Sequence, residues 1–130
     1  MKKITKLTVT DLMKNKEQYQ VKENVTEEVF IDRLGASITI RKPEKSLCIE
    51  AMQMAQDPNL ISKSDAFVAY SVIVEPNLKD KELQKEFGCV EPTDIIDKIF
   101  EPGEITGIAK LALELAGYTK ALKKVKDLKN

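Results

Sequence analysis

The sequence predicts one α+β domain that is predominantly α-helical, with several short helices and one N-terminal β-hairpin. Three observations lead to this fold class. Between Val25 and Lys42, apolar residues recur at every second position, which is the period of a strand with one buried face. Several other segments, most clearly Glu104 to Ala116, carry apolar residues at helical spacing. Proline and glycine divide residues 75–103 into short pieces.

The first element is a short amphipathic helix within residues 8–20. Thr8 stands three residues before Asp11, a spacing at which the hydroxyl and the carboxylate can satisfy free backbone amides of a first helical turn. Residues 18–24 contain few apolar side chains, which predicts a solvent-exposed connecting segment. We therefore expect residues 1–24 to be flexible.

The hairpin follows in residues 25–42. Its strands are marked by Val29 and Ile31 before the turn, and by Ile38 and Ile40 after it. Gly35 can supply the positive φ that a tight turn requires, although Asn-Gly or Asp-Gly would be a clearer turn signal.

Two helices are expected next. Pro43 opens a helix over residues 44–55 with Leu47, Ala51 and Met54 on one face, and the segment 57–59 ends it.

The following segment, residues 66–74, is apolar enough to be the most buried helix of the domain. Ser62 and Asp65 repeat the capping spacing before it. Its valine and isoleucine content leaves a strand as the alternative.

After residue 74, short helices joined by tight corners are expected to wrap the core. Leu83 and Phe87 lie four residues apart, and a second apolar face comprises Ile95, Ile96, Ile99 and Phe100. The clearest helix, residues 104–116, is stopped by Gly117 and carries Ile105, Ile108, Leu111, Ala112 and Leu115. Residues 119–130 could form a thin amphipathic helix that frays.

Composition restricts the class of protein. The chain has 130 residues, 42% of them hydrophobic and 32% charged, which suits one domain spanning residues 1–130. The 21 basic and 21 acidic residues balance, so no overall field favours nucleic acid or anionic lipid. Cys48 and Cys89 follow no metal or redox spacing, which indicates buried free thiols in a reducing cytosol. No apolar run resembles a signal peptide or a membrane span, so a soluble cytoplasmic protein is expected.

No catalytic residue, cofactor site or metal site is predicted. The chain has no histidine, and its five glycines form no phosphate-binding loop. Asp94, Asp97, Glu101 and Glu104 lie at roughly helical spacing, which would suit a cation or an acid/base pair, but a solvated acidic face is the preferred interpretation.

Charge is nevertheless uneven along the chain. Residues 75–104 hold nine acidic and four basic side chains, whereas residues 105–130 hold six basic and two acidic. Between molecules these segments could orient a head-to-tail contact, and a merely solvated surface is the alternative. The basic tail also suggests a small nucleic-acid-binding regulatory protein, but Tyr118 is the one aromatic nearby and the tail has no arginine, so nucleic acid is an unlikely partner.

Five segments of the chain are distinctive: residues 74–84 (VEPNLKDKELQ), 87–89 (FGC), 91–105 (EPTDIIDKIFEPGEI), 113–118 (LELAGY) and 127–130 (DLKN). In these segments, the second half of the chain resembles the XkdN-like phage tail assembly chaperones of Bacillus prophages. The resemblance extends more loosely to residues 35–43, and the first two dozen residues match weakly.

This resemblance implies a non-catalytic chaperone that binds the tape measure protein, keeps it soluble and helps the tail tube assemble around it. It also implies a protein of the host cytoplasm that is absent from the mature virion. In related phages, a frameshifted longer product engages the tail tube protein. The family offers no catalytic residues.

Self-association is also expected, because such a chaperone needs exposed apolar stripes rather than a reaction centre. We place the partner or self-association surface on the helix 104–116 and the tail. Its residues are Ile108, Leu111, Leu115, Tyr118, Leu122 and Val125.

Overall fold

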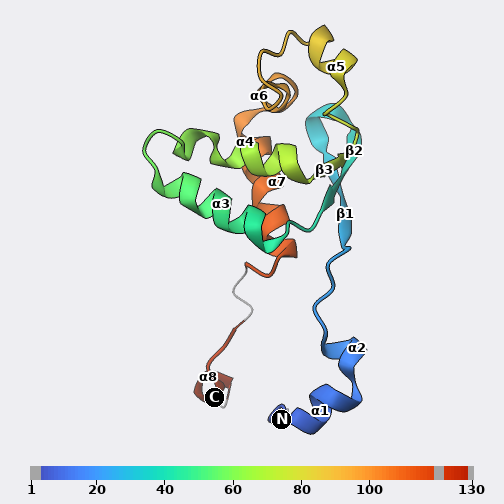
Figure 1. Ribbon diagram of the computed structural model, residues 1–130, viewed down its shortest axis with the longest axis vertical. Coiled ribbons are helices and arrows are strands. Elements are labelled where there is room, and N and C mark those ends of the chain that lie inside the picture. The colour runs from blue at the N-terminus through green and yellow to red at the C-terminus, as the bar shows by residue number, and fades with distance from the viewer. Residues whose placement is uncertain (1–3, 119–121, 129–130) are drawn as a thin grey trace.

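The computed structural model describes residues 4–118 and 122–128. A body of helices packs beside a small antiparallel sheet, and the two terminal segments project from one end of that body (Figure 1). This arrangement confirms the mixed α+β class with a helical majority.

The predicted hairpin is present, but it is part of a larger sheet. Strands β1 (Thr26–Ile31) and β2 (Ala36–Arg41) pair antiparallel, with Val29 opposite Ile38. A short 3-10 helix, η1 (Asp32–Leu34), and Gly35 at φ 61° make the turn. A third strand, β3 (Ile73–Glu75), adds to β2 from the middle of the chain, giving the order β1-β2-β3. The sheet is therefore not simply an N-terminal hairpin.

The N-terminal helix is interrupted once. Helices α1 (Val9–Lys14) and α2 (Lys16–Tyr19) replace the single expected helix, because Asn15 has φ −121° and ψ 44°. The predicted cap is confirmed: the Thr8 hydroxyl accepts from the Asp11 amide, and the Asp11 carboxylate accepts from the Thr8 amide, both at 3.1 Å.

Helices α3 (Lys45–Gln56) and α4 (Ile61–Val72) form an antiparallel pair (Figure 1). The segment 66–74 is thus helix as far as Val72 and strand beyond it. The expected cap by Ser62 and Asp65 is wrong, since α4 begins at Ile61 after an uncapped Leu60. The Asp57 carbonyl accepts from the amides of Leu60 and Ile61, so the turn runs directly into the helix.

Short helices follow, as expected: α5 (Lys81–Glu86), α6 (Asp94–Ile99) and the four-residue α8 (Val125–Leu128). The long helix α7 spans Pro102–Leu115, so it starts two residues earlier than predicted. Pro102 opens this helix instead of interrupting it, because the first turn needs no amide there. Gly117, at φ 90°, follows its end.

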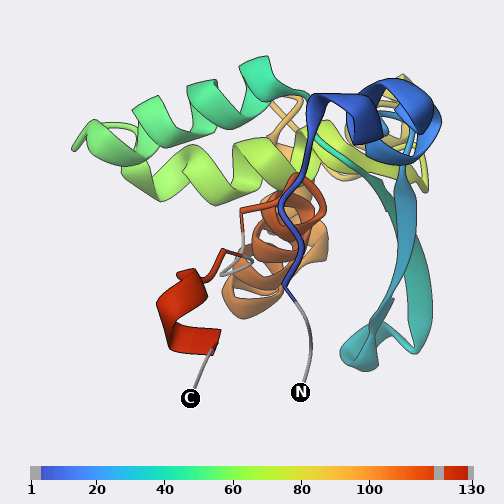
Figure 2. The ribbon, with the colours of Figure 1, turned by 90° about the horizontal axis from the view of Figure 1, so that it is seen from below.

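The core is built around α7 and α4. Figure 2 shows α3 and α4 in one layer with α7 beneath them and the sheet along one side. The side chains that fill this space and are at most 2% exposed include Ile40, Val68, Ala69, Val72, Ile95, Ile96, Ile108, Ala109 and Ala112. The Ser64 hydroxyl also donates to the Ala51 carbonyl at 3.0 Å, which ties α4 to α3.

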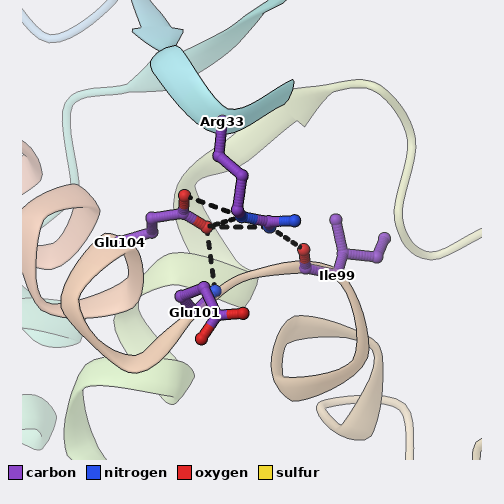
Figure 3. Close-up of polar contacts among 4 residues, drawn as sticks. All are labelled: Arg33, Ile99, Glu101 and Glu104. Carbon is purple, nitrogen blue, oxygen red and sulfur yellow. Dashed lines mark hydrogen bonds and ion pairs between the residues drawn. The ribbon is translucent and has the colours of Figure 1, made fainter. Parts of the chain in front are cut away.

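One arginine joins the tip of the hairpin to the corner between α6 and α7 (Figure 3). The Arg33 guanidinium donates to both carboxylate oxygens of Glu104, with a shortest distance of 2.9 Å, and to the Ile99 carbonyl at 2.6 Å. Glu104 also accepts from the Glu101 amide at 2.8 Å, which closes the first turn of α7. This contact holds the sheet against the helices.

Candidate partner-binding surface

The N-terminal arm, residues 4–24, lies outside the core. Neither α1 nor α2 has a buried residue, and local hydrogen bonds such as the Thr8–Asp11 cap hold their turns. The arm nevertheless carries seven large apolar side chains that are between 41% and 76% exposed: Ile4, Leu7, Val9, Leu12, Met13, Tyr19 and Val21.

Val9 and Met13 are the clearest pair among them. They lie four residues apart on α1, so they share one face of that helix, and they are 71% and 76% exposed. An apolar face that its own chain leaves open is typical of a surface that another protein covers.

The arm is anchored to the body at its root. The Lys42 amide donates to the Val25 carbonyl at 2.8 Å, and the Lys42 ammonium donates to the Lys22 carbonyl at 2.7 Å. These bonds fix where the arm leaves β1, while α1 and α2 extend away from the body (Figure 1).

A cavity of about 710 Å³ lies at this root, and we call it the terminal cavity. Its apolar lining comes from Val21, Val25, Pro43, Val74, Ala116 and Tyr118, with Cys48 at the start of α3. Charged side chains around it are Glu23, Arg41, Lys42, Glu44 and Lys45. The terminal cavity thus lies where four elements meet: β1, β3, α3 and the end of α7.

Cys48 is not a reactive group in this cavity. Its side chain is 1% exposed, and burial raises the pKa of the thiol, with a further rise from the Glu44 carboxylate and an opposing effect of the Tyr118 hydroxyl. The thiol therefore stays protonated near neutral pH, and the thiolate is the nucleophilic form.

The structure divides the six predicted partner residues into two groups. Ile108 is 2% exposed and belongs to the core. It is therefore not a surface residue, contrary to our expectation. Leu111 and Leu115 are partly buried against the same core. Tyr118, Leu122 and Val125 are exposed, by 49%, 93% and 50%, and Tyr118 lines the terminal cavity.

Sequence reasoning missed the two most exposed of the large apolar side chains that the structure describes on the body. Phe30 on β1 is 63% exposed, and Val90, between α5 and α6, is 93% exposed. Phe30 was detectable, because the strand alternation that buries Val29 and Ile31 turns it outward. Val90 had no such signal, since it belongs to a loop.

The acidic cluster has mainly structural roles. The hydrogen bond from Arg33 lowers the pKa of Glu104, and the Glu91 amide chiefly lowers that of Asp94. Both carboxylates are therefore ionised acceptors, and neither has the raised pKa of a general acid. Within residues 4–118 and 122–128, no group of three or more potential ligands is placed to hold a metal ion. In the same residues, every helix is too short or too polar to cross a membrane.

Comparison with known proteins gives one family and one fold. A family model described as phage XkdN-like tail assembly chaperone protein matches residues 9–129. The structure is similar to a crystal structure of the protein YqbN, a structural genomics target, with 20% sequence identity and a TM-score of 0.56. The match covers 90% of this chain and 100% of that chain, and at this identity it supports the fold alone. No curated protein sequence matches the chain.

Proposed function

The chain belongs to the XkdN-like family of phage tail assembly chaperones, and on this premise we propose that it is a non-catalytic chaperone that binds the tape measure protein. The chaperone covers apolar surface of the tape measure protein, which keeps the tape measure protein soluble and promotes assembly of the tail tube. We place this activity in the host cytoplasm, with the chaperone absent from the finished virion. A longer frameshifted form would engage the tail tube protein.

The observation that carries this proposal is the exposed apolar face of the N-terminal arm. Leaving apolar area in water costs about 25 cal/mol per Å², so a face with Val9 and Met13 more than two-thirds exposed gains free energy when a partner covers it. A long helical client presents apolar residues at the same three- and four-residue spacing, which suits packing of helix against helix.

The exposed tail residues Leu122 and Val125 would extend this surface. They come after Tyr118, which lies just beyond the end of α7 and lines the terminal cavity together with Val21 and Val25 at the root of the arm. Both terminal segments therefore leave the body around one cavity, where a single client segment can contact both.

The test is co-expression with the tape measure protein of the same prophage, followed by size-exclusion chromatography with light scattering. We expect the chain to make the tape measure protein soluble and to co-elute with it. Replacing Val9 and Met13 together with Gln should weaken this complex by at least about tenfold, because two buried apolar contacts are lost. Replacing Leu122 and Val125 with Asp should also weaken it.

Phe30→Gln is the matched control, since it removes from the body an apolar side chain that is also mostly exposed, by 63%. It should leave the complex intact. If the tape measure protein stays insoluble with both the short and the frameshifted chain, the proposed client is wrong. Salt-dependent binding of the chain to generic duplex DNA through its Lys120–Lys129 tail would then test the nucleic-acid alternative.

A further inference from the structure

The two edges of the sheet differ in how easily another strand can join them. Strand β3 forms one edge, but it is three residues long and is followed at once by Pro76, which has no backbone amide to donate. Strand β1 forms the other edge over six residues, Thr26–Ile31, without proline or glycine. An edge of this length presents a row of backbone amides and carbonyls with which an incoming strand can pair.

The hydrogen bonds at the two ends of β1 show which of its residues face the free edge. The Val25 carbonyl accepts from the Lys42 amide at 2.8 Å, and the Ile31 carbonyl accepts from the Gly35 amide at 2.9 Å. In an antiparallel ladder, the backbone groups of successive residues point alternately toward the neighbouring strand and away from it. The residues whose amides and carbonyls point to the free edge are therefore Thr26, Glu28 and Phe30.

The side chains of these three residues share the outer face of the sheet. Ile31 is 6% exposed and Val29 packs against the core, which identifies the inner face, and side chains alternate along a strand. All three outward residues are exposed, Phe30 by 63%. The edge is thus open to a partner through its backbone and through one row of side chains.

This edge is acidic. Glu27 and Glu28 lie on opposite faces of β1, and neither forms an ion pair within the part of the chain that the structure describes. On the outer face, Glu28 is opposite Thr39, and Thr39 is opposite Glu75, so two carboxylates lie in one row across the sheet. Both carboxylates of this row line a shallow hollow in the outer face.

The charge of the edge selects what can pair with it. Two copies of β1 that paired antiparallel in full overlap would place Glu28 of one copy directly opposite Glu28 of the other. Like charges opposite one another in a ladder destabilise the pairing. A strand that carries lysine or arginine at the facing position brings opposite charges together instead.

We propose that β1 binds an extended, cationic segment of a partner protein, which adds to the sheet as a fourth strand. Basic side chains of this segment lie on the outer face, where they meet the Glu28 and Glu75 carboxylates and the ring of Phe30. The alternate side chains point to the inner face beside Val29, where apolar residues fit. The segment therefore alternates basic and apolar residues, and it differs from the helical client that the arm covers.

The experiment titrates the full chain with a synthetic probe, an eight-residue peptide amide of alternating lysine and valine, in a calorimeter. The wild-type chain should bind this peptide, and the affinity should fall as salt rises. A peptide with glutamate in place of lysine should bind at least about tenfold more weakly, because it meets the carboxylates of the edge with like charge.

N-methylation of the peptide tests the backbone pairing. In an added strand, the amides of either the lysines or the valines face β1, and the other set points away from it. Methylating the facing set should abolish binding, and methylating the other set should retain it. Antiparallel pairing predicts the loss with the lysines, and parallel pairing predicts it with the valines. An equal effect of both modifications would mean that charge alone holds the peptide, which overturns the proposal.

Substitutions in the chain test the edge itself. Glu28→Lys should weaken binding by at least about tenfold, whereas the matched control Glu86→Lys, which reverses an exposed carboxylate on α5, should bind within about twofold of wild type. Thr26→Pro removes an outward amide at the first position of β1, where proline is tolerated. Its circular dichroism should match that of wild type while the peptide binds more weakly.

A wild-type chain that does not bind the lysine–valine peptide at about 1 mM and low salt would refute the proposal. Equal weakening by Glu28→Lys and Glu86→Lys would refute it too. So would a dimer in light scattering that Thr26→Pro abolishes, since a second copy would then occupy the edge. The arm is intact in all these variants, so they should still solubilise the tape measure protein, and the two proposals stand or fall separately.

Discussion

Replacing Ile108 with Ala should destabilise the fold strongly, although its spacing on α7 resembles that of a binding stripe. The side chain is 2% exposed and packs in the cluster formed with α4 and the sheet. Truncating such a buried isoleucine removes its transfer free energy and leaves a cavity, at a cost of about 3 kcal/mol. For 130 residues this corresponds to a fall in Tm of about 10 °C.

Urea unfolding followed by circular dichroism measures this cost. With a slope of about 1.5 kcal/mol per M, the midpoint should fall by about 2 M. The matched substitution is Leu122→Ala, whose side chain is 93% exposed and which should change the free energy of unfolding by no more than about 0.5 kcal/mol. If Ile108→Ala cost less than about 1 kcal/mol, or if Leu122→Ala cost as much, the division between core and surface drawn here would be refuted.

Three further predictions concern contacts within the body. The contact with Arg33 lowers the pKa of Glu104 in the folded protein below its usual value of 4.5. The contact therefore stabilises the fold fully above pH 4.5, and this stabilisation is lost as the pH falls through the lowered pKa of Glu104. Arg33→Gln should therefore be less stable than wild type at pH 7, and this difference in the free energy of unfolding should shrink as the pH falls below 4.5; a constant difference would contradict this. In the native chain, Cys48 should react with a thiol reagent far more slowly than the partly exposed Cys89. In denaturant the two thiols should react equally fast. Mass spectrometry of the single variants Cys48→Ala and Cys89→Ala measures both rates. Ser64→Ala should cost about 1 kcal/mol in urea unfolding, since it removes a buried hydrogen bond to the Ala51 carbonyl, and no change would mean that this bond does not tie α3 to α4.

The elements with a strong period were predictable from the sequence. The alternation of Val29 and Ile31 with Ile38 and Ile40 set the strands, and the structure pairs Val29 with Ile38 as one buried face requires. The Thr8–Asp11 cap was predictable for a local reason, because both of its bonds lie within four residues.

One failure depends on contacts that are distant in sequence, and a second on a local rule for the start of a helix. Strand β3 is three residues long and continues directly from α4, so no alternation marks it, and it exists because β2 has a free edge beside it. Pro102 looked like a break because a proline inside a helix removes an amide bond, but at the first helical position that amide has no partner to lose.

The position of Ile108, one of the predicted partner residues, is instructive. A helix that is apolar on one side can face either its own core or a partner, and the sequence of α7 has the same period in both cases. Contact with α4 decides between them, and it places Ile108 inside. Strongly exposed apolar side chains lie on the arm, on the tail and on the loop between α5 and α6, and of these the sequence analysis had included only the tail in the partner surface.

Under the proposed function, this distribution separates the residues that fold the chain from those that bind its client. The core uses the central helices and the sheet, so the arm can change its apolar residues without loss of packing, since α1 and α2 bury none. The α5–α6 loop is different, because the bonds that orient Val90 also hold the start of α6. Arm substitutions should therefore affect partner binding alone, whereas loss of the Asp94 carboxylate would affect both the loop and the helix that it precedes.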